Sequence, residues 1–188
     1  MEEKCQGVLL QSIAYLGKKR ILKIVTPEEG LLTLMAKSMS ALTTPFCIAE
    51  WVYRKTTKEI HPFIDGTLLD PLLELRQNYA TLISAGAMAQ DLLRSQFPAK
   101  KDPALYQLFC AYLKKLPHFS KPEILAASFR LKLLLHEGLL SLQHPSPHFT
   151  DEEWKITTLL AYSRQFSLLQ EIEQAPTTKI DYLFKEQM

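Results

Sequence analysis

The chain has 188 residues, 47% of them hydrophobic and 22% charged, which is the composition of one or two ordinary globular domains. Its first residues lack the charged and apolar regions of a signal peptide, and no run of about 18 uncharged apolar residues predicts a membrane span. We therefore expect a cytoplasmic protein without membrane contact. The cysteines, Cys5, Cys47 and Cys110, are too scattered for a disulfide framework or a paired-cysteine metal site, so we expect reduced thiols.

The net charge of +2 is small but unevenly distributed. Residues 1–66 carry nine Lys and Arg against seven Asp and Glu, residues 67–140 carry nine against six, and residues 141–188 carry four against seven. A polyanion should therefore meet the first two segments rather than the last one.

The first 66 residues predict five short strands. The stretch Arg20–Thr26 alternates its apolar and polar residues with a period of two, which is typical of a strand with one buried face. Proline and glycine in the segment 27–30 predict the turn that follows. The expected strands are Val8–Ser12, Arg20–Thr26, Leu31–Lys37, Phe46–Arg54 and Glu59–Phe63. Because closure removes the exposed edges of so small a sheet, we expect an OB-like β-barrel.

From Asp70 onward the pattern becomes helical. Asp70 and Asp102 are each followed by proline, and an N-cap followed by proline at the first helical position predicts a helix start. A third and more apolar helix is expected from Ser120 to a glycine cap at Gly138. Lys132 would lie on the flank of its apolar arc, and Arg130 on the opposite, polar face.

The remaining sequence predicts a loop at 139–148 and then a capping box made by Thr150 and Glu153, followed by one or two further helices. The fold class is thus α+β, with a five-stranded OB-like barrel at 1–66 followed by an α-helical domain at 67–188. We expect the connection between them at residues 66–70.

Five segments in this order give the chain a family resemblance. They are GVLLQS, IVTPEEGLLTLMAK, PFCIAEWVYRK, DPALYQLFCAYL and SFRLKLLLHEGLL. This series resembles that of the bacterial DNA repair protein RecO. The resemblance implies an OB-fold and a helical domain of the RecO C-terminal type, acting in DNA damage repair through the RecF pathway of recombination. It also implies binding to single- and double-stranded DNA, strand annealing, and recombinase loading together with RecR and the single-stranded DNA-binding protein SSB, at the nucleoid when engaged.

Two departures from the family pattern matter for function. Many members carry a four-cysteine zinc module after the helix that ends here at Gly138, whereas this chain has no cysteine there, and His144 and His148 are only two potential ligands. We therefore expect no zinc and no other cofactor. The basic loop that follows the third strand in the family is replaced here by the uncharged segment 38–44.

The barrel segment supplies the expected DNA-binding cations, since phosphate binding requires cations held on a common face. They are Lys18, Lys19, Arg20, Lys23, Lys37, Arg54, Lys55 and Lys58. Tyr15, Trp51 and Tyr53 are rings that could stack on bases, although core positions are the simpler interpretation for aromatic residues in strands. The alternative for the lysines is a solvated sheet edge that prevents aggregation.

A second set of cations belongs to the helical segment. The SSB tail is acidic and ends in a phenylalanine carboxylate, so its receptor needs an apolar pocket with cations at its rim. The candidates are Lys132, Arg130, Lys114, Lys115 and Lys121. The alternatives are that Lys132 extends along an apolar surface to reach solvent and that Arg130 pairs with glutamates on its own helix face.

The sequence carries no motif of a known catalytic site or nucleotide-binding loop, so we do not expect an enzyme. Two alternatives to a DNA-binding mediator remain open. One is a protein-interaction adaptor of the same fold with weak or no DNA binding, and the other is an enzyme that uses the crevice between the barrel and the helices.

Overall fold

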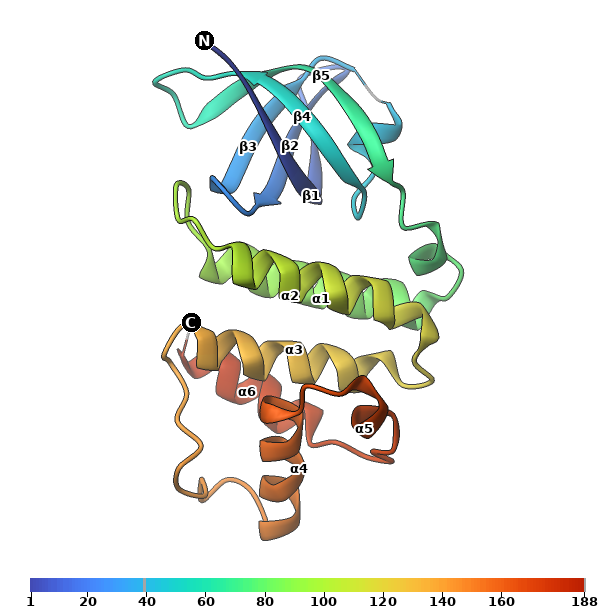
Figure 1. Cartoon of the computed structure of the whole chain (residues 1–188), viewed down its shortest axis with the longest axis vertical. Coiled ribbons are helices and arrows are strands. Elements are labelled where there is room, and N and C mark those ends of the chain that lie inside the picture. The colour runs from blue at the N-terminus through green and yellow to red at the C-terminus, as the bar shows by residue number, and fades with distance from the viewer. Residues whose placement is uncertain (39, 188) are drawn as a thin grey trace. The chain divides into compact units, whose positions relative to one another are not determined.

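The computed structural model describes residues 1–38 and 40–187, and it divides into two compact units. The first unit comprises residues 1–74 and 96–110, and the second comprises residues 75–95 and the chain from Ala111 onward. The first unit holds all the strands and most of the helix Pro103–Lys115, and the other α-helices belong to the second unit; Figure 1 shows these elements.

Five strands form a closed barrel in the order β1-β2-β3-β5-β4. Their bounds are β1 Glu2–Tyr15, β2 Lys19–Thr26, β3 Gly30–Ala36, β4 Ile48–Arg54 and β5 Ile60–Asp70. All neighbouring strands are antiparallel except β3 and β5, which pair in parallel at residues 33–35 and 60–62. The barrel predicted from the sequence is confirmed.

Alternation along the strands places large side chains inside the barrel. Leu22 and Ile24 of β2 are fully buried, whereas Lys23 between them is directed outward. Trp51 and Tyr53 of β4 are also buried, at 0% and 1% exposure, so the interpretation of these rings as core residues is confirmed. The indole Nε1 of Trp51 donates to the carbonyl oxygen of Gly7 at 3.1 Å, and therefore the buried donor is satisfied.

Two strands are longer than the sequence indicated. β1 begins at Glu2 because its first seven residues pair with β4 and its later residues pair with β2. β5 continues to Asp70, which lies opposite Ile48 of β4. The connection expected at 66–70 is therefore wrong, since these residues complete the barrel wall.

The helix start expected at Asp70 is also wrong. A carboxylate oxygen of Asp70 accepts from the backbone nitrogen of Leu72, and this contact caps a turn with Leu72 at a positive φ of 45°. A short 3-10 helix, η2 Leu73–Arg76, follows, and the first α-helix begins only at Tyr79. There the side-chain oxygen of Asn78 accepts from the backbone nitrogen of Ala80. Asn78 is therefore the residue that caps this helix.

Six α-helices lie within the described residues. They are α1 Tyr79–Ser95, α2 Pro103–Lys115, α3 Pro122–His136, α4 Asp151–Tyr162, α5 Phe166–Gln170 and α6 Thr177–Gln187. The 3-10 helices η1 Ala41–Thr43 and η3 Leu116–His118 complete the elements, and residue 39 of the uncharged segment lies outside the described residues. Within the second unit α3 packs against α1, α4 and α6, which explains its apolar surface.

Several predicted helix ends are confirmed. Asp102 accepts from the backbone nitrogen of Leu105 at the start of α2, and Thr150 and Glu153 form both hydrogen bonds of the capping box of α4. Gly138 has a φ of +70° just after α3. Local sequence signals therefore fixed these ends correctly, because the interactions involve residues only a few positions apart.

Two glycines provide a test of this packing. A Cβ atom at Gly7 would lie 2.6 Å from Ile24 Cγ2 and 2.7 Å from Val25 O, whereas at Gly86, within α1, it would meet nothing within 4 Å. We expect Gly7→Ala to lower the free energy of unfolding by about 1–3 kcal/mol through overpacking. Gly86→Ala should raise it by roughly 0.5–1 kcal/mol through helix propensity. Thermal unfolding of both variants checks this, and a stable Gly7→Ala protein would contradict the tight β1–β2 contact.

Candidate nucleic-acid interface

Outward side chains of β1, β2 and β3 form one surface near the β1–β2 turn. The register places Tyr15 opposite Lys19, and Gln11 opposite Lys23, which also faces Thr33 of β3. Between these two rows runs an apolar row, because Ile21 lies opposite both Ile13 and Met35. Residues that face each other across antiparallel strands share one side of the sheet. We call this surface the strand face: Gln11, Ile13, Tyr15, Lys19, Ile21, Lys23, Thr33 and Met35.

Six of the eight predicted DNA-binding cations have neither an acidic partner nor a side-chain hydrogen bond among the residues that the structure describes. They are Lys18, Lys19, Lys23, Lys37, Arg54 and Lys58. Lys18 lies in the β1–β2 turn and Lys37 directly follows β3, so both border the strand face, whereas Arg54 ends β4 and Lys58 lies in the β4–β5 loop. The unpaired charges of Lys18, Lys19, Lys23 and Lys37 make the strand face and its border positive.

Arg20 is held by its neighbour on β1. Its Nε donates to Ser12 Oγ at 2.6 Å and its second terminal nitrogen donates to the Ser12 carbonyl oxygen at 3.0 Å. The side chain is half-buried, and these bonds fix it at the hairpin rather than leaving it extended into solvent.

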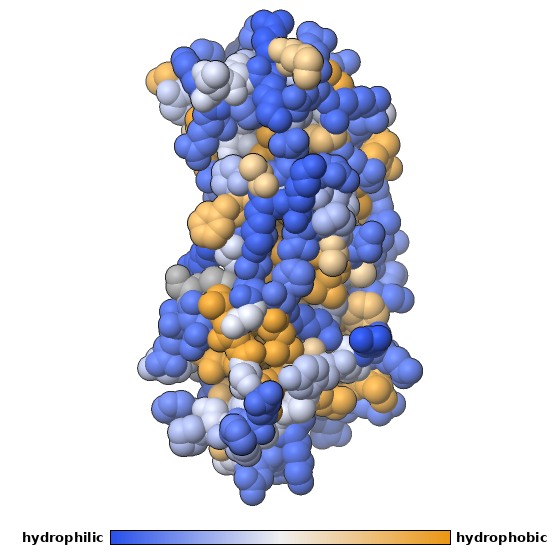
Figure 2. Space-filling model, turned by 60° about the vertical axis from the view of Figure 1, so that its left-hand side comes forward, coloured by the Kyte–Doolittle hydropathy of each residue, from blue (hydrophilic) through white to orange (hydrophobic). Residues whose placement is uncertain are grey.

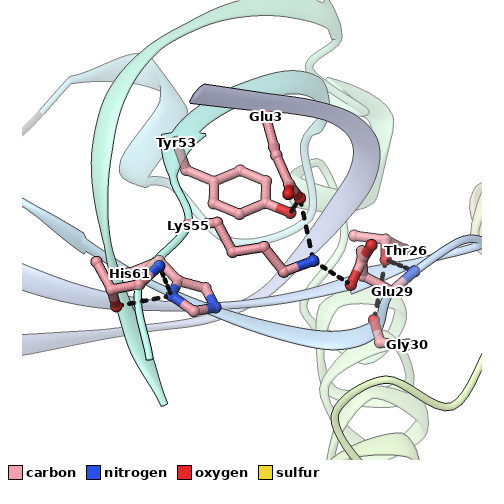
Figure 3. A network of polar contacts seen from close by, with 8 residues as sticks. Glu3, Thr26, Glu29, Gly30, Tyr53, Lys55 and His61 are labelled. Atoms are coloured by element: carbon pink, nitrogen blue, oxygen red, sulfur yellow. Dashed lines mark hydrogen bonds and ion pairs between the residues drawn. The ribbon is translucent and has the colours of Figure 1, made fainter. Parts of the chain in front are cut away.

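Lys55 is neutralised within the barrel, as Figure 3 shows. Its Nζ lies 3.2 Å from a carboxylate oxygen of Glu3 on β1 and 3.5 Å from one of Glu29 in the β2–β3 turn. The hydrogen bond to Glu3 and the charge of Glu29 raise the pKa of Lys55. Burial alone would raise the pKa of Glu3, but the hydrogen bonds from Lys55 and Tyr53 lower it. Lys55 therefore ties strand ends together instead of offering a free charge.

The three candidate rings differ in how far they are exposed to solvent. Trp51 and Tyr53 are buried, and Tyr53 donates its hydroxyl to Glu3 and stacks on His61 with a centroid distance of 5.6 Å. Tyr15 is 43% exposed on the strand face, opposite Lys19. It is thus the one of the three that a nucleic-acid base can reach.

Arg130, Lys132 and Lys121, which are among the cations predicted for the helical segment, contact groups of the second unit. Arg130 donates from Nε to Asp91 of α1 at 2.9 Å, pairs with Asp181 of α6, and lies over the ring of Phe184. The expectation that Arg130 pairs with glutamates on its own helix is wrong, because packing of α1 and α6 on α3 supplies the carboxylates. The sequence did not indicate that Asp91 is the partner of Arg130. The side chain of Asp91 is 3% exposed, and the one sequence signal for a buried pair was a carboxylate among the mostly apolar residues of α1.

Lys132 reaches the end of α4. Its Nζ donates to the carbonyl oxygens of Ala161 and Ser163 at 3.0 and 2.7 Å, where a cation complements the helix dipole. Burial and the charge of Arg164 lower the pKa of Lys132. Lys121 donates to the carbonyl oxygen of Glu173, whereas Lys114 and Lys115 are exposed at the end of α2.

An apolar pocket of about 350 Å³ lies elsewhere on the second unit. Its lining includes Phe149, Tyr182 and Leu183, with His148 and Lys179 among the polar residues. Figure 2 shows hydrophobic side chains gathered on the helical unit. The sequence did not indicate this pocket, because it joins the loop before α4 to α6.

None of the helices within the described part of the chain is long and apolar enough to cross a membrane.

The closed five-stranded barrel with unpaired cations outside it places the chain in the class of OB-like barrel proteins. A family model described as "Recombination protein O N terminal" matches residues 1–72. The DNA repair protein RecO of Chlamydia pneumoniae is 30% identical over 216 residues, covering 95% of this chain and 85% of that protein. The chain belongs to the RecO family.

Other relatives match over a smaller part of their length. The DNA repair protein RecO of Chlamydia trachomatis serovar L2 is 31% identical, covering 76% of this chain and 61% of that protein. The protein of the same name from Bacillus subtilis is 23% identical, with 74% and 57% covered. The chain thus matches less than two thirds of these two relatives.

The Arg130–Asp91 pair yields a pH-dependent prediction. Burial raises the pKa of Asp91, and the hydrogen bond and charge of Arg130 act in the opposite direction. We expect Arg130→Met to lower the free energy of unfolding by about 3–5 kcal/mol at neutral pH, because it leaves a buried charge unpaired. In this variant the folded-state pKa of Asp91 lies above the unfolded value, so the cost is present at higher pH and disappears as the carboxyl is protonated.

Thermal unfolding at pH 7.5 and pH 4.5 measures this effect. The difference in Tm between wild type and Arg130→Met should be smaller at the lower pH. Lys115→Met, which removes an exposed cation, serves as the control and should change Tm little at either pH. An equal loss of stability at both pH values would show that Arg130 acts through packing alone.

Proposed function

We propose that this chain is a DNA-binding recombination mediator of DNA repair that holds DNA on the strand face of its barrel. The observation that supports this most is that Tyr15 lies opposite Lys19 on the same face as Lys23, since neither lysine has an acidic partner in the described residues. OB-folds bind oligonucleotides with this part of the barrel and its loops. Family membership supports the repair role, because the relatives are named DNA repair proteins.

The face suits both single and double strands. Its lysines would neutralise phosphates of either form, and Tyr15 would stack on an unpaired base. Two strands held by neutralised phosphates repel each other less, so annealing would be accelerated without a catalytic group. Lys18, Lys37, Arg54 and Lys58 would extend the contact beyond the strand face, whereas Arg20 and Lys55 would act mainly within the barrel.

The salt dependence of binding tests this proposal with a matched pair of variants. Lys19→Gln with Lys23→Gln removes two unpaired charges, whereas Lys4→Gln with Lys55→Gln removes two charges that already pair with Glu50, Glu3 and Glu29. Both double variants change the net charge equally. For a labelled single strand followed by fluorescence anisotropy, the first should reduce the slope of log K against log salt by about 1.4, at roughly 0.7 per phosphate contact.

The control variant should keep the wild-type slope. Equal effects of both double variants would mean that only net charge matters, and the strand face would lose its support. A wild-type protein that binds no DNA at low salt would overturn the proposal as a whole.

We also propose SSB and RecR as partners, RecR on the strength of family membership alone. For an SSB tail, the apolar pocket beside Tyr182 is favoured over Lys132, because Lys132 already binds two carbonyl oxygens. The walls of this pocket are Phe149, Tyr182 and Leu183, which suit a terminal phenylalanine. Lys179 also lines the pocket, and its charge is shared with Glu153.

Two tyrosines of equal exposure test this pocket. Tyr182 and Tyr162 are each 57% exposed, but only Tyr182 lines it. In a titration with a labelled SSB-tail peptide, we expect Tyr182→Ala to weaken binding at least five-fold and Tyr162→Ala to leave it unchanged. Equal affinity in both variants would place the tail elsewhere, and peptide binding without any DNA binding would favour the adaptor function.

A further inference from the structure

A second cavity lies in the barrel unit, at the end of β3. Its volume is about 480 Å³, which is within the range of roughly 300–1,000 Å³ that small-molecule sites have. Leu42, Pro62, Phe63 and Ile64 give it an apolar wall, and Lys37 and Arg54 lie at the same cavity.

A β-bulge shapes the apolar wall. Val52 lies opposite Asp65 and Tyr53 lies opposite Phe63, which leaves Ile64 as the extra residue of β5. A bulge redirects side chains that would otherwise alternate between the two faces of a strand. Consecutive residues 63–65 therefore all line the cavity. The Phe63 ring is held edge-on against Trp51, with centroids 6.0 Å apart, so this wall is fixed by the barrel core.

The charges at the cavity favour an anion next to an apolar group. Lys37 and Arg54 are exposed and have no acidic partner within residues 1–38 and 40–187. The carboxylate in the wall, Asp65, accepts from the backbone nitrogen of Gly66 at 2.8 Å. A ligand with one flat apolar part and one phosphate complements this arrangement.

We propose that the cavity captures a single unpaired nucleotide of a bound strand. The base would lie against Phe63 and Ile64, and its phosphate would bind Lys37 and Arg54. The proposal rests on the DNA-binding function above, because Lys37 directly follows the strand that carries Met35 of the strand face. A paired base remains stacked inside its duplex and cannot enter without being extruded. Nucleotide capture would therefore add a preference for single strands over duplex to the binding proposed for the strand face.

A charge placed in the cavity tests this idea. Ile64→Glu adds a carboxylate where the base would lie, at a side chain that is 41% exposed. Leu69→Glu is the matched control, because Leu69 is 52% exposed, is the extra residue of the other β5 bulge, and does not line the cavity. Both variants are titrated with a labelled single strand, a blunt duplex, and an abasic strand of equal length that keeps its phosphates.

We expect Ile64→Glu to weaken binding of the single strand roughly ten-fold relative to Leu69→Glu, since stacking of one base accounts for a change of that order. The two variants should bind the duplex and the abasic strand equally. If Ile64→Glu does not fold, Arg54→Gln compared with Lys4→Gln, whose lysine pairs with Glu50, replaces the pair, and only Arg54→Gln should reduce the ratio of single-strand to duplex affinity.

The outcomes separate this inference from the proposed function. If the wild type binds all three probes and Ile64→Glu keeps the wild-type ratio of single-strand to duplex affinity, nucleotide capture is overturned and DNA binding is left intact. A wild-type protein that binds none of the probes overturns both. A loss that is the same for the base-containing and abasic strands shows repulsion of phosphate by the new carboxylate, and this also overturns capture of a base.

Discussion

The barrel depends on one strand that pairs with two neighbours. β1 binds β4 through residues 2–8 and β2 through residues 8–15, so it must bend where the two pairings meet. Gly7 lies at this bend, and only a residue without a Cβ atom leaves room for Ile24 and the Val25 carbonyl. Its own carbonyl oxygen accepts the indole proton of Trp51. Gly7 therefore serves both the closure of the barrel and the burial of its largest side chain, Trp51.

Closure of the barrel also determines which of its charged side chains form ion pairs. At the ends of β1 and β4 the charged side chains pair, as Lys4 does with Glu50 and Lys55 with Glu3 and Glu29. Near the β1–β2 turn the facing residues are Tyr15, Gln11 and apolar side chains, so Lys19 and Lys23 find no carboxylate in the described chain. A barrel with a small net charge thus still presents a positive face to a polyanion.

The helical unit uses its cations differently. Arg130 joins α3 to α1 and α6, and Lys132 completes the carbonyl end of α4. Such cations fix helix packing, and a buried pair leaves little charge for an acidic partner. The acidic peptide proposed above would instead use the apolar pocket beside Tyr182.

The sequence by itself determined the features that depend on neighbouring residues. Period-two alternation indicated the strands, and the caps at Asp102, Thr150 and Gly138 were readable because each involves residues a few positions apart. Family resemblance was carried by the same local patterns. Tertiary structure alone decided the pairing of β1 with two strands, the extension of β5 to Asp70, and which cations are free. Lys55 and Lys19 look alike along the chain, but only folding brings Glu3 and Glu29 to one of them and Tyr15 to the other, because charge pairing is a property of distance in space.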